Sequence, residues 1–206
     1  GLFSNKLRKS AGDVTFSNWK GVPVFKKRTR EVRNPQTQAQ MIQRAKMKAL
    51  SGIGSIAIQA IRLGFAKLAK GKSEYNVFAS RNMPEVTGFP DLTANVNYPN
   101  LQFSFGGLTG INGVTAPSVV GDDVTINWTA PNPGALDEND QVVLVAFRTN
   151  RAPAADTVPA IAKTDGAATA TLPDVQAGDI IEVYAFARNP STGNVSGTAY
   201  AGQVVA

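Results

Sequence analysis

The sequence predicts a multi-part α+β chain: an extended basic arm with a hairpin, then a long helix, then an all-β sandwich. Three observations predict this class. Basic residues concentrate in the first 82 positions, apolar residues at helical spacing follow an N-cap signal near residue 34, and short apolar runs between turn residues fill the second half. We therefore expect a basic arm, hairpin and helical anchor over residues 1–82, an extended linker over 83–100 and a β-sandwich domain over 101–206.

Charge divides the chain into two halves of opposite sign. Residues 1–82 carry 17 lysines and arginines against three acids, and residues 83–206 carry four against twelve. The net charge of +6 is therefore the sum of +14 in the first segment and −8 in the second. Like charges in one segment repel each other unless an anionic partner faces them. Four kinds of anionic partner fit this pattern: nucleic acid, an acidic protein surface, a membrane headgroup layer and the acidic half of a neighbouring copy. The remaining interpretation is that the basic residues form a merely solvated face.

The sequence contains no histidine and no cysteine. Histidine is the commonest general base and metal ligand, and the cysteine thiolate is a nucleophile and zinc ligand. We therefore expect a protein that is not an enzyme, with no catalytic residue, metal site, cofactor or small-molecule substrate. Residues 66–73 match a loose P-loop pattern, but a helix rather than a strand precedes them, so nucleotide hydrolysis is not expected.

A β-hairpin is predicted over residues 14–27, where apolar and polar residues interleave on both sides of a turn at 18–21. Pro23 cannot donate to a ladder, so the hairpin belongs at a sheet edge or on a partner. Trp19, beside Lys20, suits a partner pocket or stacking on a nucleic-acid base. Packing in a local core is an equally good interpretation of this tryptophan.

The segment after the hairpin is too basic to pack internally, and we expect it to be extended and to face a partner. With the tryptophan and the basic residues of the following helix it forms the predicted partner-contact set: Trp19, Lys20, Lys26, Lys27, Arg28, Arg30, Arg33, Arg44, Lys46 and Lys48. Such a cluster can neutralise phosphates without reading sequence, and the binding would then depend strongly on salt. No base-reading motif accompanies it, so protein docking is favoured over nucleic acid.

A helix is predicted from residue 36 to about residue 70, because Asn34 is a suitable N-cap and Pro35 suits the first helical position. Gly52 and Gly54 are where we expect it to break. Residues 49–61 carry no charge, but 13 residues fall short of the roughly 20 that a bilayer span needs. We expect their apolar face to pack in a bundle with other copies or under the β module, with contact to a membrane surface as the less favoured alternative.

The second half reads as short strands between clusters of glycine, proline, asparagine and aspartate. The predicted strands cover residues 101–105, 124–128, 142–147, 167–172, 180–187 and 197–205. Their spacing predicts a sandwich with an immunoglobulin- or fibronectin-like layout. Trp128 and Tyr184 are expected to face each other as core aromatic residues.

Different short motifs are spread over most of the chain: Asn18-Trp19-Lys20-Gly21, Asn34-Pro35-Gln36-Thr37-Gln38, Gln43-Arg44-Ala45, Leu63-Gly64-Phe65, Phe103-Ser104-Phe105-Gly106, Leu108-Thr109-Gly110, Val124-Thr125-Ile126-Asn127-Trp128 and Asp140-Gln141-Val142. In these motifs the chain resembles a family of functionally uncharacterised proteins of about this length, common in Bacteroidetes and their phages. The N-terminal motif also resembles a pattern found in phage virion and tail-associated proteins. The resemblance implies that the protein is a virion component, and it identifies no catalytic residue.

Together these observations predict a non-catalytic structural protein of a bacteriophage virion, assembled in the host cytoplasm. The basic segment would anchor it in a multi-copy capsid, vertex, neck or tail, and the sandwich would pack on neighbours or project. Its expected partners are other virion proteins and copies of itself, with non-specific DNA contact through the basic segment. Two alternatives are a non-specific nucleic-acid-binding or packaging protein and a bacterial surface adhesion module.

Overall fold

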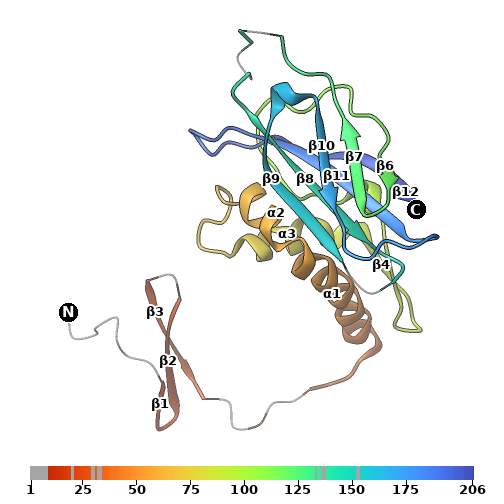
Figure 1. Cartoon of the computed structure of the whole chain (residues 1–206). Helices are drawn as coiled ribbons and strands as arrows, with labels where there is room; N and C mark the ends of the chain where they lie inside the picture. Colours follow the sequence, from red (N-terminus) through yellow and green to blue (C-terminus); the bar gives the residue numbers. More distant parts are fainter. Residues whose placement is uncertain are drawn as a thin grey trace. The chain divides into compact units, whose positions relative to one another are not determined.

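The structure is a computed structural model of the chain (Figure 1). It describes residues 9–19, 21–28, 31, 34–132, 134–135, 138–151 and 154–206. The chain divides into two compact units, residues 1–37 and residues 38–206. Below, the arm denotes the described residues between 9 and 28, and the body denotes residues 38–206. This division differs from the expected boundaries after residues 82 and 100.

The arm is a three-stranded antiparallel sheet in the order β1-β2-β3. Its strands are β1 (Lys9–Ala11), β2 (Val14–Trp19) and β3 (Val22–Lys27), so the predicted hairpin is confirmed and β1 is an additional strand. In the turn, Asn18 Oδ1 accepts a hydrogen bond from the backbone N–H of Gly21 at 3.0 Å. Gly21 has φ +83°, a left-handed conformation that glycine adopts without strain. Strand β3 lies at the sheet edge, where Pro23 can be accommodated.

The predicted long helix is instead two shorter helices, α1 (Gln38–Ile56) and α2 (Ile58–Gly64), and a third, α3 (Glu74–Asn82), follows them. The break falls at Ala57, and both glycines expected to break the helix lie inside α1. A Cβ on Gly54 would lie 2.6 Å from the Tyr75 ring, so the glycine allows the aromatic ring to approach the α1 backbone. Helix α3 lies beyond the predicted helical part, and the Ser73 side chain caps it by accepting from Asn76 N at 3.1 Å.

Residues 83–100 are folded, so the predicted extended linker is wrong. They form the 3-10 helix η1 (Met83–Glu85), the antiparallel pair β4 (Val86–Gly88) and β5 (Ala94–Val96), and the 3-10 helix η2 (Tyr98–Asn100). Pro84 and Pro99 each lie in the first turn of a 3-10 helix, where proline costs no hydrogen bond. Helix α1 packs closely on the hairpin, since a Cβ on Gly88 would lie 2.5 Å from Ile42 Cγ2.

The rest of the body contains two antiparallel sheets. The four-stranded sheet has the order β12-β11-β8-β9 and the three-stranded sheet the order β10-β7-β6. Their strands are β6 (Ser118–Val120), β7 (Asp123–Asn127), β8 (Gln141–Arg148), β9 (Ala155–Ala162), β10 (Ala167–Thr171), β11 (Ile180–Arg188) and β12 (Ala199–Val205). Five predicted strands are confirmed, β6 and β9 are additional, and residues 101–105 are not a strand.

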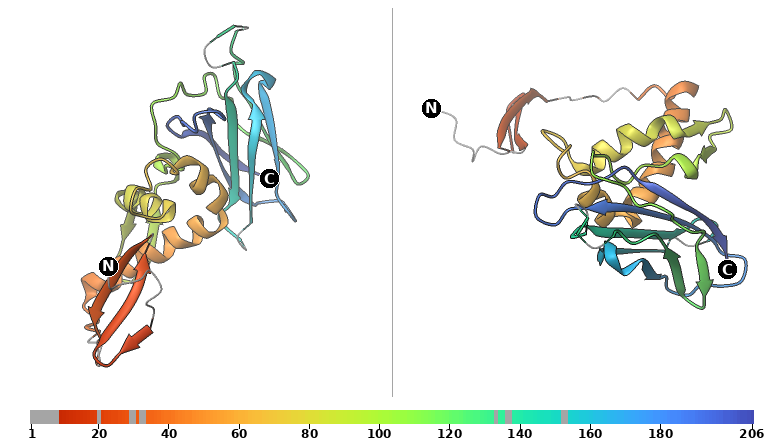
Figure 2. Two further views of the ribbon diagram at one scale, coloured as in Figure 1. Left: turned by 90° about the vertical axis from the view of Figure 1, so that its left-hand side faces the viewer. Right: turned by 90° about the horizontal axis from the view of Figure 1, so that it is seen from above.

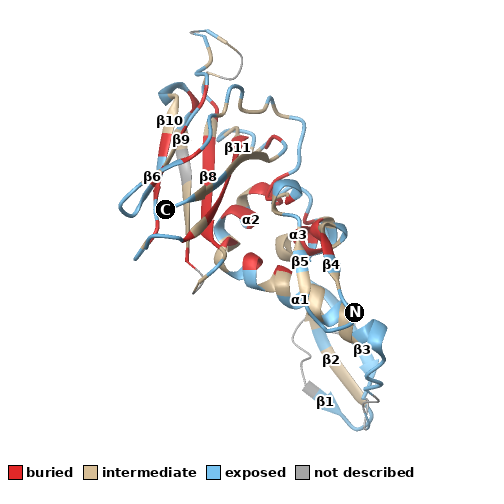
Figure 3. Cartoon of the chain, turned by 90° about the vertical axis from the view of Figure 1, so that its right-hand side faces the viewer, coloured by how far each residue is buried: buried red, intermediate tan, exposed pale blue. Residues whose placement is uncertain are grey.

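The four-stranded sheet is buried on both faces, which explains why β8 and β11 are apolar at nearly every position. Alternate residues of β8 pack toward the three-stranded sheet, and those between them pack with the helices. Figure 2, in the view from above, shows the helices on one side of this sheet, and Figure 3 shows buried residues along β8, β11 and α2. The helices therefore share a core with the β-sheets and do not form a separate anchor.

Trp128 and Tyr184 are both buried, as predicted, but they do not face each other. Trp128 belongs to the core between the two sheets, whereas Tyr184 belongs to the core beneath the helices. The Trp128 indole N–H donates to the backbone oxygen of Lys163 at 2.8 Å. The β-rich body thus has three layers, and the immunoglobulin- or fibronectin-like layout stays a prediction.

Candidate interaction sites

The arm exposes its apolar side chains. Trp19 is 53% exposed, Val22 61% and Phe25 74%, and no residue whose burial is described between 10 and 37 is buried. A small sheet with no packed face is at best marginally stable in water. The local-core interpretation of Trp19 is therefore wrong, and the arm presents a surface that a partner could cover.

Both faces of the arm sheet combine apolar side chains with a lysine. Phe16 pairs with Phe25 and Val14 pairs with Lys27, and these pairs share one face because side chains alternate along a strand. On the other face Trp19 pairs with Val22, followed by the pairs Ser17 with Val24 and Thr15 with Lys26. Each face therefore offers an aromatic ring, and each has a lysine toward the same end of β3.

The structure places only part of the predicted partner-contact set on the arm. Lys26, Lys27 and Arg28 are exposed, and none of them pairs with a carboxylate in the described part of the chain. The backbone N–H of Arg28 donates to the oxygen of Asp13 at the end of the ladder. Lys20, Arg30 and Arg33 lie outside the described residues.

Three further members of the set lie on α1, which belongs to the body, so the ten residues span two compact units. Arg44 and Lys48 are exposed and lie one turn apart. Lys46 is half-buried, and a Cβ on Gly88 would lie 3.0 Å from its Cγ, so its aliphatic stem covers β4. Lys46 therefore has a packing role that the charge pattern did not predict.

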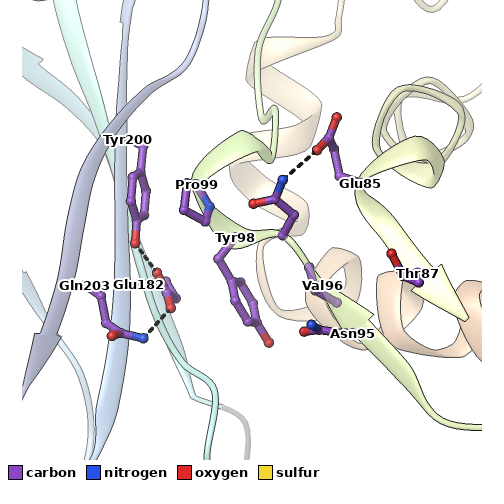
Figure 4. Close-up of a pocket in the computed structure, with 10 residues that line it drawn as sticks. Glu85, Thr87, Asn95, Val96, Tyr98, Pro99, Glu182, Tyr200 and Gln203 are labelled. Carbon is purple, nitrogen blue, oxygen red and sulfur yellow. Dashed lines mark hydrogen bonds between the residues drawn. The ribbon is translucent and has the colours of Figure 1, made fainter. Parts of the chain in front are cut away.

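The body contains a cavity of about 380 Å³ beside the β4-β5 hairpin and the strands β11 and β12, which we call the acidic pocket (Figure 4). No lysine or arginine occurs among its described lining residues. These are Glu85, Thr87, Asn95, Val96, Asn97, Tyr98, Pro99, Glu182, Tyr200 and Gln203. Two carboxylates without a basic neighbour give the pocket a negative character.

Glu182 is the buried carboxylate of the acidic pocket, with 1% of its surface exposed. Its Oε2 accepts a hydrogen bond from the Tyr200 hydroxyl at 2.7 Å, and its Oε1 accepts one from Gln203 Nε2 at 2.9 Å (Figure 4). Burial raises the pKa of Tyr98, and the charge of Glu182 raises it further. Burial also raises the pKa of Tyr200, as does its hydrogen bond to Glu182. Both donors to Glu182 are neutral, so its charge has no cationic counterpart within the described residues.

Glu85 supplies the second carboxylate from η1. Its Oε2 accepts from Asn97 Nδ2 at 3.1 Å and from Asn100 Nδ2 at 3.0 Å, which fixes it to the turn around η2. Sequence reasoning missed both glutamates. The available signal was Glu182 itself, a charged residue inside the apolar run 180–187, because a buried charge needs a structural or binding reason.

A second cavity of about 280 Å³, the apolar pocket, adjoins the first and shares Asn95, Val96 and Tyr98 with it. Helix α1 and the end of β8 supply half of its described lining residues, among them Ala49, Ile53, Ile56 and Phe147. Arg148 and Arg151 also line it. Both cavities therefore meet along β5.

The described residues contain no group of three histidine, cysteine, aspartate or glutamate side chains that could hold a metal ion. Among the described helices, none is long and apolar enough to cross a membrane. Residues 49–61 contribute Leu50, Ile53, Ala57 and Ile61 to the core under the β-sheet, one of the two packing arrangements expected for this stretch.

Comparison with known proteins places the chain in a family. The model of a family of unknown function, DUF6266, matches residues 6–202, which is nearly the whole sequence. Comparison with curated proteins finds no match. The resemblance to an uncharacterised family is confirmed at this level, and we conclude that the chain belongs to the DUF6266 family.

Proposed function

We propose that this protein is a non-catalytic component of a multi-copy assembly, held in place through its arm. The observation that carries the proposal is the three-stranded sheet in which no residue of described burial is buried, and in which Trp19 and Phe25 are exposed beside Lys26 and Lys27. Such a sheet becomes stable when a partner covers it. Complete burial of a side chain such as Phe25 contributes roughly 1.5–3 kcal/mol, so a few anchors of this kind can hold a subunit.

The assembly that we propose is a bacteriophage virion, in which the arm anchors the protein in a capsid, vertex, neck or tail. The support for a virion is the resemblance of the N-terminal motif to phage virion proteins. The body would then pack on neighbouring subunits or project from the particle, with an immunoglobulin-like layout of its two sheets.

The test compares self-association of the full chain and of a Val22→Ser/Phe25→Ser variant by analytical ultracentrifugation. We expect the wild-type chain to associate and the variant to associate at least tenfold more weakly, because two exposed apolar anchors are lost. Val120→Ser is the matched control, since Val120 is a 79% exposed strand residue of the body. A wild-type chain that stays monomeric and binds no co-expressed virion protein would overturn the proposal.

A second candidate function, non-specific nucleic-acid binding, is favoured by the three consecutive exposed cations Lys26, Lys27 and Arg28. The logarithm of the DNA affinity should then fall linearly with the logarithm of salt concentration, by about 0.9 per phosphate contact. Replacing the three residues by glutamine should lower that slope by about 3. Binding that does not respond to salt rejects this function.

A further inference from the structure

We propose that the acidic pocket and the apolar pocket together receive the arm of a second copy of this chain, with Lys27 beside Glu182 and Phe25 in the apolar pocket. The inference rests on the proposed function and names its partner.

The first argument is the uncompensated charge of Glu182. The carboxylate is almost fully buried, and each of its oxygens accepts one hydrogen bond from a neutral side chain. A buried charge is costly unless an opposite charge pairs with it, and a carboxylate oxygen can accept more than one hydrogen bond. An ammonium group entering the acidic pocket supplies the opposite charge and a further hydrogen-bond donor.

The walls of the acidic pocket also suit a cation. Figure 4 shows the rings of Tyr98 and Tyr200 on either side of Glu182. Aromatic faces attract ammonium and guanidinium groups, and the attraction is stronger when the cation is desolvated. Glu85 adds a second negative charge at the opposite wall, and the cavity of about 380 Å³ accommodates a long side chain.

The second argument is the match in spacing and chemistry between the two pockets and β3. Phe25 and Lys27 lie on the same face of β3, because they pair with Phe16 and Val14 of β2. Two residues along a strand correspond to roughly 7 Å. The acidic and apolar pockets adjoin along β5, so one strand can place the ring in one pocket and the ammonium group in the other.

The third argument is that the complementary charges belong to the same sequence. Residues 1–37 carry a net +7 and residues 83–206, the acidic part of the body, a net −8, so the N-terminal segment of one copy is attracted to that part of another. A contact between two different surfaces of identical chains is head-to-tail and produces rings or filaments. This is the form of contact that a multi-copy shell or tube requires.

The absence of cysteine allows a direct test by cross-linking. One variant carries Arg28→Cys, which keeps Lys27 in place, and another carries Thr87→Cys, at a lining residue of the acidic pocket. The two are mixed with a short bismaleimide. We expect a cross-linked heterodimer from this mixture and at most a tenth as much when Val120→Cys replaces the pocket variant. Equal yields from the two mixtures would overturn the inference.

Charge reversal provides the second test in the full-length chain. Lys27→Glu and Glu85→Lys should each weaken self-association at least tenfold, and mixing the two variants should restore it. Lys70→Glu makes the same charge change at an exposed position of the body outside both pockets and should leave association unchanged. Thermal unfolding of each variant establishes that it is folded. Glu182→Gln is a milder change that removes the charge of the buried carboxylate, and it should also weaken self-association.

The outcomes separate this inference from the proposed function. If Val22→Ser/Phe25→Ser abolishes association but Glu85→Lys and Glu182→Gln do not, the arm binds elsewhere and the inference is wrong while the function stands. If the wild-type chain associates with nothing, the proposed function fails first. Association with a different protein that the pocket variants do not affect also overturns the inference.

Discussion

The Tyr200 hydroxyl donates a 2.7 Å hydrogen bond to the Glu182 carboxylate, and so joins the acidic pocket to the aromatic core of the body. The Tyr200 ring lies 5.2 Å from that of Tyr184, which stacks on Phe147 at 5.6 Å. The Tyr184 hydroxyl in turn donates to the backbone oxygen of Tyr98 at 2.9 Å. The same cluster therefore supports the sheet and positions two walls of the pocket.

Tyr200→Phe should lower the free energy of unfolding by about 1–3 kcal/mol, because it removes one of two donors to a buried carboxylate. Urea unfolding measures the change. Tyr75→Phe is the matched control, since the Tyr75 hydroxyl has no partner among the described residues and its loss should have little effect. Equal stability of the two variants would show that water replaces the Tyr200 hydroxyl.

Gly64→Ala should be strongly destabilising, because the added Cβ would lie 2.0 Å from the Phe103 oxygen and 2.8 Å from Ser104 Cα. Overpacking against backbone typically costs 1–3 kcal/mol or more. Gly52→Ala is the contrasting variant within α1, where a Cβ meets nothing within 4 Å. It should stabilise the protein by roughly 0.5–1 kcal/mol, because alanine is the better helix former. Thermal melts of both variants check that the two substitutions change the stability in opposite directions.

The stability of the protein should fall in acid because of Asp179. Hydrogen bonds from Arg151 hold the pKa of Asp179 well below the ordinary range of aspartate, and Arg148 adds a buried contact at 3.2 Å. A lowered pKa in the folded state stabilises the protein above the unfolded pKa of about 3.9, and this contribution is lost as pH falls below it.

Asp179→Asn should therefore reduce stability at neutral pH and show a smaller further loss in acid than the wild type. The loss should not vanish, because Arg151 also lowers the pKa of Asp174. Urea unfolding between about pH 7 and pH 3 measures both effects. Asp165→Asn, at an exposed position, should keep the wild-type dependence. An unchanged acid response in Asp179→Asn would contradict this assignment.

The hairpin and most strands could be predicted because alternation and turn residues are local signals. The layering could not, since the predicted sandwich buries only one face of each sheet. Their continuous apolar runs, 142–147 and 180–187, already indicated burial on both faces. That second face is where the helices pack, and it explains why the predicted boundary after residue 82 fails.

The candidate sites were predictable only in part, for a related reason. The exposure of Trp19 and Phe25 depends on the absence of a covering layer, which no local pattern reports. The acidic pocket joins Glu85, Tyr98 and Glu182 from distant parts of the sequence. Such a site depends on tertiary packing, and only the charged residue inside the β11 run pointed toward it.

Tryptophan fluorescence should report whether the arm is covered in the assembly. The chain has two tryptophans: Trp19 is 53% exposed in the arm, and Trp128 is 6% exposed and donates to the Lys163 oxygen at 2.8 Å. In dilute solution acrylamide should quench Trp19 readily and Trp128 poorly, because quenching requires contact with the ring. Trp128→Phe isolates the Trp19 signal, and Trp19→Phe isolates that of the buried residue.

As protein concentration rises and copies associate, the Trp19 signal should shift to shorter wavelength and become protected from acrylamide. The Trp128 signal should stay constant, because the core that surrounds it is already complete within one body. Phe25 and Lys27, which we place in the two pockets, lie on the opposite face of the arm sheet, so protection of Trp19 would report that a neighbour covers this second face as well. Trp19 that stays equally accessible in dilute and associated protein would mean that association leaves this face of the arm uncovered.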